Sequence, residues 1–425
     1  MRRSTLTLPA IALTGALALT ACGSGADDGP VTLRFLSLAW QTDSVEANER
    51  LVAEWNEAHP DVQVEYVQGS WDNVNDQLMT GFEAGDPPDI IHNDSPALAD
   101  FAGRGYLADL TEYLPEDLKS DIRPEAWETA TFDDQIVGVP FLQESQVFIA
   151  NRKLLEEAEV RIPTPDDPWT WDEFAEASEK LTDDDTYAVA WPLGSPVNRV
   201  LNLSLNYGGT FFEVDGEGRA SAKMGDAELE VLRRIHDQLY TDETADPATV
   251  GMSGSDPLPA FFAEEYAMVQ TGVYARQQVA EQAPDDFDWV TIPPLVGDTA
   301  EQGATSQTLS VAADSANPEQ AAEFISFFLN AENQVDLALG DWLVPTSQEA
   351  AAAPELNTEE NDWHVATASA EDLVFAPYLR VQGFDEWKTR VAQPALEEYF
   401  NDRISLEELS ERLETEGDDV LSRYN

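Results

Sequence analysis

The sequence predicts an α/β fold, and three observations support this. Segments typical of strands and segments with helical spacing alternate from residue 31 to residue 91. A second alternation begins at residue 147, which predicts a second α/β unit. The 425 residues are enough for two or three domains, and their 43% hydrophobic content is enough for large cores.

The first unit is predicted to contain three strands and two helices. A continuous apolar run predicts a buried strand over residues 31–39, and alternation predicts a second strand over 62–67. Apolar residues at helical spacing predict helices over 45–59 and 74–84, and a short strand follows at 90–91. Strands that alternate with helices in this way form a parallel sheet with right-handed crossovers.

Polar and aromatic side chains follow two of these strands. Trp40 and Gln41 come directly after the first strand, and Asn93 and Asp94 come after the third. Because the ligands of open α/β sheets bind beyond the carboxyl ends of the strands, we expect these four side chains to face a ligand crevice. The alternative for Asp94 is that it only caps the following helix.

The second unit is predicted from residue 147 onward. Its first strand spans residues 147–151, and Thr170 followed by Glu173 matches a capping box at the start of a helix. Further strands are predicted at 188–191, 267–271 and 308–312. From residue 331 to the end, the sequence is mostly helical.

The N-terminus has the features of a secretory signal. Two arginines precede a short apolar run that ends in Leu19-Thr20-Ala21-Cys22, and Cys22 is the only cysteine of the chain. This ending looks like a bacterial lipobox, which predicts a signal peptide over residues 1–21 and lipidation of Cys22. The alternative is an ordinary signal peptide with a chance cysteine. Residues 22–30 would then be a lipid anchor and flexible linker, and we expect a protein anchored at the extracellular face of the cell membrane.

Composition argues against several classes of function. The chain has 82 acidic and 23 basic residues, a net charge of −59, which disfavours nucleic acid and anionic lipid head groups as partners. A single cysteine and four scattered histidines predict no metal site, and we expect no cofactor. The acidic composition is expected to suit a saline environment, and the alternative is a cationic ligand. After the signal, no stretch of about eighteen apolar residues predicts a membrane span.

Several short strings occur in an order and at separations typical of one family. They are residues 84–90 (AGDPPDI), 169–174 (WTWDEF), 262–274 (FAEEYAMVQTGVY), 317–325 (NPEQAAEFI) and 344–347 (VPTS). Together, behind a lipobox, they resemble the extracellular solute-binding proteins of carbohydrate ABC transporters, the maltose-binding-protein-like family. The resemblance implies a periplasmic-binding-protein-like fold of two α/β lobes joined by hinge strands, and a protein that is not an enzyme.

The resemblance also implies how the chain is divided and how it works. Lobe I would comprise residues 31–142 with 303–343, and lobe II residues 143–302 with 344–425. A sugar or oligosaccharide would be captured between the lobes by hinge closure and delivered to the permease subunits of an ABC importer. We expect the protein to be a monomer.

The resemblance implies two further ligand contacts. Tyr274 lies where the family places a stacking aromatic, and Glu144 matches an acidic residue of the hinge region. The alternatives are a buried tyrosine and a solvent-facing carboxylate. Because a sugar is held by aromatic faces and planar polar groups, other aromatic residues are candidates too, with core positions as the alternative. These are Trp191, Tyr207, Trp342 and Trp387, with Trp71 at the start of a helix. Arg276 could pair with an acidic ligand or with a neighbouring carboxylate.

Two other functions are alternatives. The net charge would also fit a binding protein for a polyamine or a peptide. A secreted lipoprotein glycosidase that uses two carboxylates is less favoured, because 82 acidic residues offer pairs everywhere and so carry no information. The sequence also has no Gly-x-Ser-x-Gly and no His-Glu-x-x-His motif.

Overall fold

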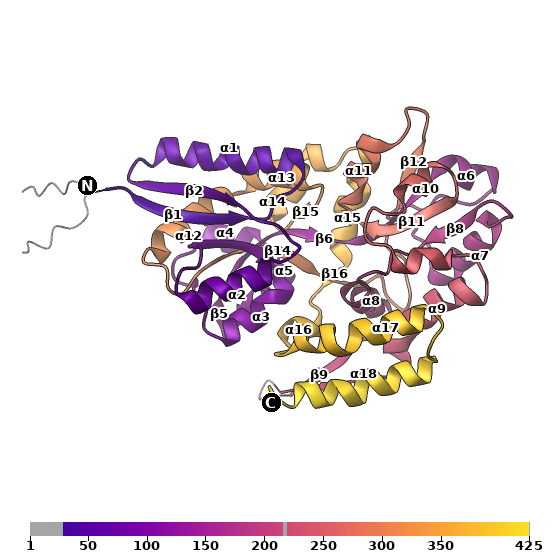
Figure 1. Ribbon diagram of the computed structural model, residues 1–425. Helices are drawn as coiled ribbons and strands as arrows, with labels where there is room; N and C mark the ends of the chain where they lie inside the picture. The colour runs from indigo at the N-terminus through magenta and orange to yellow at the C-terminus, as the bar shows by residue number, and fades with distance from the viewer. Residues whose placement is uncertain (1–28, 216–218, 425) are drawn as a thin grey trace, which may run out of the picture.

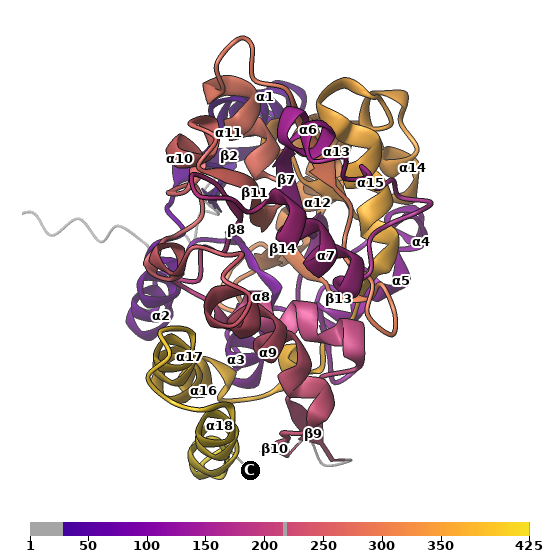
Figure 2. The ribbon, with the colours of Figure 1, turned by 90° about the vertical axis from the view of Figure 1, so that its right-hand side faces the viewer.

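The computed structural model describes residues 29–215 and 219–424, which fold into two α/β lobes (Figure 1). The predicted signal peptide, the predicted lipidation site Cys22 and all but the last two residues of the predicted linker lie outside the described residues. Each lobe has its own sheet, and helices enclose the strands when the molecule is seen along its length (Figure 2). The predicted two-lobed α/β fold is confirmed.

Lobe I is built on a six-stranded sheet with the order β15-β6-β14-β3-β1-β2. Its strands are β1 (Val31–Ser37), β2 (Val62–Gln68), β3 (Ile90–Asp94), β6 (Val139–Glu144), β14 (Thr305–Val311) and β15 (Val344–Pro345). The first three strands are parallel, as predicted. β14 returns from later in the chain and pairs antiparallel between β3 and β6, which makes the sheet mixed.

Eight helices of lobe I cover this sheet in the described chain. They are α1 (Thr42–Ala58), α2 (Val74–Ala84), α3 (Ser95–Gly103), α4 (Glu116–Asp121), α5 (Pro124–Glu128), α12 (Pro318–Phe328), α13 (Ala331–Asp341) and α14 (Gln348–Ala351). The predicted apolar stripe of α1, including Leu51 and Trp55, is buried. Phe35 of β1 packs against Phe324 and Phe328 of α12, so the first and later parts of the chain share one core.

Lobe II is built on a four-stranded sheet with the order β12-β7-β11-β8. Its strands are β7 (Gln146–Asn151), β8 (Tyr187–Ala190), β11 (Tyr266–Gly272) and β12 (Trp289–Ile292). β11 is parallel to β8, whereas β7 runs antiparallel to both of its neighbours. A separate hairpin pairs β9 (Phe212–Val214) with β10 (Ala220–Ala222).

The helices of lobe II surround this sheet and extend along one side of the molecule. They are α6 (Arg152–Glu157), α7 (Trp171–Leu181), α8 (Val197–Ser204), α9 (Asp226–Tyr240), α10 (Leu258–Phe262), α11 (Ala275–Gln282), α16 (Phe384–Trp387), α17 (Gln393–Phe400) and α18 (Leu406–Leu421). The capping box at the start of α7 is confirmed: Glu173 N donates to Thr170 Oγ1 at 3.1 Å, and Thr170 N donates to Glu173 Oε2 at 2.9 Å.

The chain passes between the lobes three times. Ser145 is the first crossing, between β6 and β7, and residues 293–304 form the second, between β12 and β14. The third follows α15 (Trp363–Ser369), where β16 (Leu373–Val374) pairs with β13 (Gln302–Gly303). The three crossings therefore run side by side.

Hydrogen bonds of buried groups join these crossings. The side chain of Gln302 accepts from Gln146 N at 2.8 Å and donates to Gln146 O at 2.9 Å. The hydroxyls of Ser145 and Ser369 are 2.5 Å apart. Because buried polar groups are costly when left unpaired, these bonds fix the crossings relative to one another.

The lobe boundary predicted at residues 343/344 differs from the structure. β15 pairs with β6 in lobe I, and Thr346 Oγ1 donates to Pro140 O at 2.8 Å. Trp363 and Leu373 lie in the lobe I core. The chain thus stays with lobe I to about residue 373, because its apolar side chains complete that core, and only the C-terminal helices join lobe II.

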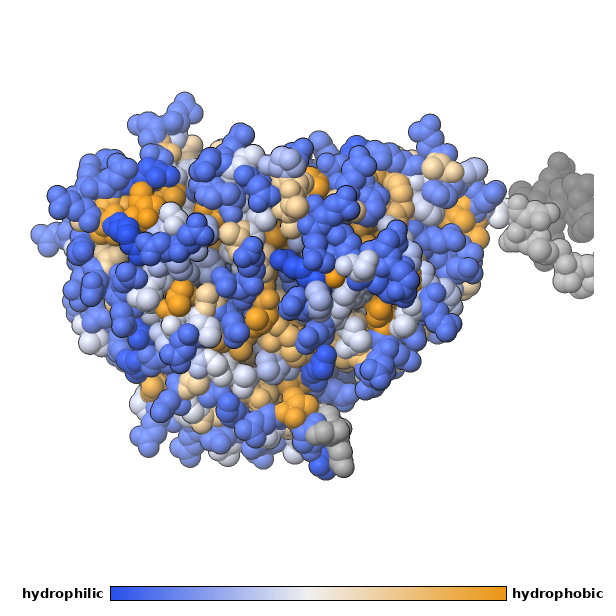
Figure 3. Space-filling view, turned by 180° about the vertical axis from the view of Figure 1, so that it is seen from behind, coloured by the Kyte–Doolittle hydropathy of each residue, from blue (hydrophilic) through white to orange (hydrophobic). Residues whose placement is uncertain are grey.

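The surface is mostly hydrophilic. On the face seen from behind, blue side chains cover most of the area and the apolar areas are small and separate (Figure 3). Within the two described ranges, no helix is long and apolar enough to cross a membrane.

Replacing Gln302 by leucine tests the bond between the crossings. Gln302→Leu removes both hydrogen bonds to Gln146 and is expected to lower the free energy of unfolding by about 1 to 3 kcal/mol, measured by urea titration. Gln135→Leu, at an exposed position, is the control and should change stability by less than about 0.5 kcal/mol. If the two substitutions changed the free energy of unfolding equally, the proposed role of the Gln302 hydrogen bonds would be contradicted.

Candidate functional site

A cavity of about 490 Å³ lies between the two lobes, and we call it the interlobe cavity. Lobe I supplies Trp40, Trp71, Asp94, Gln307, Asp341 and Leu343, together with Glu144 and Thr305 at the strand ends next to the crossings. Lobe II supplies Ser255, Tyr274 and Gln278. Because both lobes contribute, the volume of the cavity depends on the angle between them.

The lobe I wall is formed where strands end. Trp40 follows β1 and is 52% exposed, which is high for so large an apolar side chain. Asp94 ends β3 and is the N-cap residue of α3, but its side chain makes no capping hydrogen bond. Gln307 of β14 lies opposite Asp94 in the sheet. The strand-end argument thus placed Trp40 and Asp94 at the cavity, and the backbone N–H of Ala97 in the first turn of α3 favours the ionised form of Asp94.

The lobe II wall presents Tyr274 directly after β11, with Gln278 one turn later on α11. The rings of Trp40 and Tyr274 meet edge to face, with centroids 6.5 Å apart and an interplanar angle of 76°. Each lobe therefore brings an aromatic ring to the same part of the cavity.

Glu144 stands at the first crossing, at the end of β6. Gln146 Nε2 donates to Glu144 Oε1 at 2.7 Å. Burial raises the pKa of the Glu144 carboxyl, and the nearby Arg199 guanidinium opposes the rise. Gly272 leaves room here, because a Cβ at this position would clash with the Glu144 carboxylate and approach the Tyr274 ring.

Asp341 ends α13 and is directed to the cavity by a tight turn. The next residue, Trp342, has a φ of 54° in the left-handed region, which stops the helix. The Asp341 side chain lines the cavity, although the residue is only 4% exposed. Burial raises its pKa to about 6, and the Ser44 hydroxyl opposes the rise. Burial also raises the pKa of Asp94, and the positive charge of Lys388 opposes this rise.

Gln41 and Asn93 stand behind the wall and do not line the cavity. With its amide oriented so that nitrogen faces the neighbouring oxygens, Gln41 donates to Gly340 O at 2.8 Å and to Gln277 Oε1 at 2.9 Å. Asn93 Nδ2 donates to Asn75 Oδ1 at 2.9 Å. Both are buried and support neighbouring segments, so the prediction that they face the crevice is corrected.

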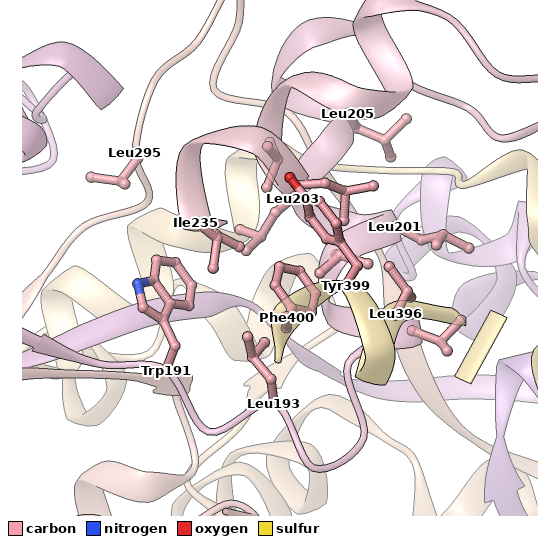
Figure 4. Packing of buried hydrophobic residues seen from close by; sticks show 14 of the residues in the cluster. Trp191, Leu193, Leu201, Leu203, Leu205, Ile235, Leu295, Leu396, Tyr399 and Phe400 are labelled. Carbon is pink, nitrogen blue, oxygen red and sulfur yellow. The ribbon is translucent and has the colours of Figure 1, made fainter. Parts of the chain in front are cut away.

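Trp191 and Trp387, predicted as ligand contacts, lie in the lobe II core. Trp191 is fully buried with Leu193 and Phe400 (Figure 4), and its Nε1 donates to Gln238 Oε1 at 2.9 Å. Trp387 is also fully buried, and Phe212 packs against its ring with centroids 4.8 Å apart. Both residues therefore match the alternative of a core position, because each indole is buried among apolar side chains.

Tyr207 and Trp342 are also away from the cavity lining. Tyr207 packs on the lobe II core with the Arg234 guanidinium 5.5 Å from its ring centroid. Trp342 packs on Trp363, with ring centroids 5.6 Å apart. The indole is partly buried against the lobe I core, and the Arg276 guanidinium carbon lies 5.5 Å from the centroid of its ring.

Arg276 is held by main-chain carbonyls; burial lowers its pKa, and the nearby Asp362 carboxylate opposes the fall. It is fully buried, and its guanidinium donates to Trp342 O at 3.3 Å and Asn361 O at 3.0 Å. The guanidinium carbon is 4.4 Å from the centroid of the Trp363 ring. Arg276 thus joins α11 to the segment that follows α13, and this places the two walls of the cavity relative to each other.

Six lining residues carried no local signal in the sequence. They are Ser255, Gln278, Thr305, Gln307, Asp341 and Leu343. Most of them lie on β14, at the end of α13 or on α11. These segments are far from the first strands in sequence, and only the folded chain brings them to the cavity. Trp71, which the sequence predicted as a candidate ligand contact at the start of a helix, lines the cavity. Among the described residues, no group of three or more His, Cys, Asp or Glu side chains could hold a metal ion.

An interlobe cavity with side chains from both lobes and crossing strands beside it is the architecture of a binding protein that closes on its ligand. Residues 39–335 match the family described as bacterial extracellular solute-binding proteins. The chain belongs to this family, as the sequence resemblance predicted.

Known relatives agree with this assignment. The chain is 50% identical, over 92% of its length and 87% of the relative, to a Streptomyces antibioticus protein described as an uncharacterized lipoprotein in the oleD 5′ region. It is 23% identical to the maltotriose-binding protein of Pyrococcus abyssi, over 75% of this chain and 67% of that one. The solved structure of the sugar-binding protein MalE from Xanthomonas citri superposes with a TM-score of 0.80 at 19% identity, covering 93% of this chain and 98% of that one.

The buried carboxyl of Asp341 makes stability depend on pH. Its pKa is about 6 in the folded chain and 3.8 when exposed, so ionisation disfavours the folded state as pH rises through this range. Asp341→Asn is expected to raise the free energy of unfolding at pH 7 by about 2 to 3 kcal/mol, with no gain at pH 3.5. Urea titrations at both pH values measure this. The control Glu332→Gln removes an exposed carboxylate of α13, and an equal gain there would contradict the account.

Proposed function

We propose that this protein is the sugar-capturing component of an ABC importer. It binds a sugar or oligosaccharide in the interlobe cavity, closes around it and presents it to membrane permease subunits. The observation that carries the proposal is the pair of aromatic rings, Trp40 and Tyr274, which come from opposite lobes to one part of a polar cavity.

The chemistry of the cavity fits a carbohydrate. Aromatic faces cover the C–H patches of a pyranose ring, and carboxylate or amide groups bind its hydroxyls. Trp40, Trp71 and Tyr274 provide the aromatic surface. Carboxylates and the amides of Gln278 and Gln307 lie around them. The maltotriose-binding and sugar-binding relatives support the same ligand class.

Closure follows from the division of the cavity between two lobes. A ligand that contacts Trp40 and Tyr274 together gains binding energy only when the lobes are near each other, so it shifts the population toward the closed form. The three crossings would bend, and the closed shape would be what the permease recognises.

The location of the protein completes the proposal. Lipidation of Cys22 would hold it at the extracellular face of the membrane, beside the permease, and it would act there as a monomer. The lipoprotein description of the relative from Streptomyces antibioticus supports the anchor. Binding proteins of this family release their ligand unchanged, so we expect oligosaccharides to be bound without the release of reducing ends.

Alanine substitutions of the two aromatic rings test the sugar site. Trp40→Ala and Tyr274→Ala are each expected to weaken the binding of the best ligand from a panel of malto- and chito-oligosaccharides by about tenfold or more, because each removes a stacking surface. Isothermal titration calorimetry measures the dissociation constants. The control Tyr113→Ala removes an aromatic ring that is 43% exposed outside the cavity and should leave binding unchanged.

Two results would contradict the proposal. One is a panel in which no oligosaccharide binds the unmodified protein. The other is a ligand whose affinity is equal in the unmodified protein and in both cavity variants, which would place its site elsewhere.

A further inference from the structure

The interlobe cavity is lined by three acidic residues and by no basic one. Of its lining residues, Asp94, Glu144 and Asp341 carry carboxyl groups, and none is Lys, Arg or His. A neutral sugar needs acceptors for its hydroxyl groups, but the Gln and Thr side chains of this cavity already supply them. The number of carboxylates therefore calls for a separate explanation.

Two of the three carboxylates have a cation of the chain nearby. Arg199 is buried close to Glu144 and favours its ionised form, and Gln146 donates a hydrogen bond to the same carboxylate. Lys388 of the C-terminal lobe II segment favours the ionised form of Asp94. The charge of these two groups is thus partly balanced from within the protein.

The negative charge of Asp341 has no cation of the described chain close to it. It is 4% exposed, and no Lys, Arg or His of the described chain forms an ion pair with it. The nearby Ser44 hydroxyl favours its ionised form but is no cation. A buried carboxylate without a cation is costly, and such groups are normally paired. Since this side chain lines the cavity, the missing partner can be supplied by whatever fills it.

The surroundings of Asp341 suit a cation attached to a ring. Gln41, next to Trp40 in the chain, is in contact with the carbonyls of Gly340 and Asp341, so Trp40 and Asp341 belong to adjoining parts of the wall. The Tyr274 ring meets Trp40 from the other lobe. Aromatic faces attract cations as well as C–H surfaces.

We infer that the ligand is an amino sugar, a sugar or oligosaccharide with a free ammonium group that pairs with Asp341 while its ring packs on Trp40 and Tyr274. The inference rests on the proposed function and specifies its substrate class. It does not extend to flexible polyamines, because the aromatic rings from the two lobes favour a ligand with a rigid, partly apolar ring.

A matched series of ligands tests the inference. Chitotriose (the glucosamine trisaccharide), its N-acetylated form and cellotriose share one linkage and differ in an ammonium, an acetamide or a hydroxyl group at C2. Titration calorimetry at pH 7 should show that the ammonium form binds about tenfold tighter than the other two, since the ion pair is charge-assisted. Glucosamine, N-acetylglucosamine and glucose, at millimolar concentration, repeat the comparison without dependence on linkage.

Variants assign the preference to one carboxylate. Asp341→Asn should remove most of the tenfold preference of the ammonium ligand over its acetamide and hydroxyl counterparts. Glu332→Gln, an exposed position on the same helix with the same change of charge, should retain the preference. Raising the salt concentration should weaken binding of the ammonium form alone.

The results separate this inference from the proposed function. If neutral sugars bind as tightly as their ammonium counterparts, the inference is wrong and the proposed function stands, with Asp341 binding a hydroxyl group. If the preference exists but survives in Asp341→Asn, the assignment to Asp341 is wrong. If no carbohydrate of either series binds, the proposed function itself fails.

Discussion

The structure depends on the close association of three chain crossings between two sheets. At the first crossing one residue, Ser145, separates a strand of lobe I from a strand of lobe II. The side chain of Gln302 joins this crossing to the second through two hydrogen bonds. Because the joint is narrow and its polar groups are paired within it, bending there would change the angle between the lobes. The cavity forms beside this joint, so its walls move with the lobes.

Charge is distributed differently inside and outside the cavity. Hydrophilic side chains cover most of the face seen from behind (Figure 3), and solvent-accessible acidic groups such as Glu54 and Glu230 pair with arginine. Inside the cavity, burial disfavours the charged form of all three carboxyl groups, and Asp341 is the one without an ion pair or a nearby cation in the described chain. A cavity whose buried negative charge has no cationic partner can gain affinity for a ligand that brings a positive charge. In this account, the acidity of the whole chain and the acidity of the cavity have different causes.

The sequence could predict those parts of the site that follow from local rules. Trp40 and Asp94 were found because the carboxyl ends of parallel strands meet at one edge of a sheet. Glu144 and Tyr274 required the family resemblance. Asp341 could not be found in this way, since it reaches the cavity only after β14 and α13 return to the first sheet. Aromatic residues after strands were ambiguous: Trp191 also follows a strand, but in lobe II it turns into the helix layer, where Gln238 pairs its indole nitrogen. The lobe boundary near residue 344 was predicted too early, because a two-residue edge strand has no recognisable pattern.

The distance between the lobes in solution tests the central claim most directly. Spin labels at cysteines introduced at Asp76 of α2 and Glu281 of α11, both exposed, would report it by double electron–electron resonance in a protein whose Cys22 is replaced by serine. The account predicts that the tightest-binding sugar shortens this distance, and that the Trp40→Ala and Tyr274→Ala variants need more sugar for the same change. A sugar that saturates the protein while the distance distribution stays unchanged would contradict capture by closure.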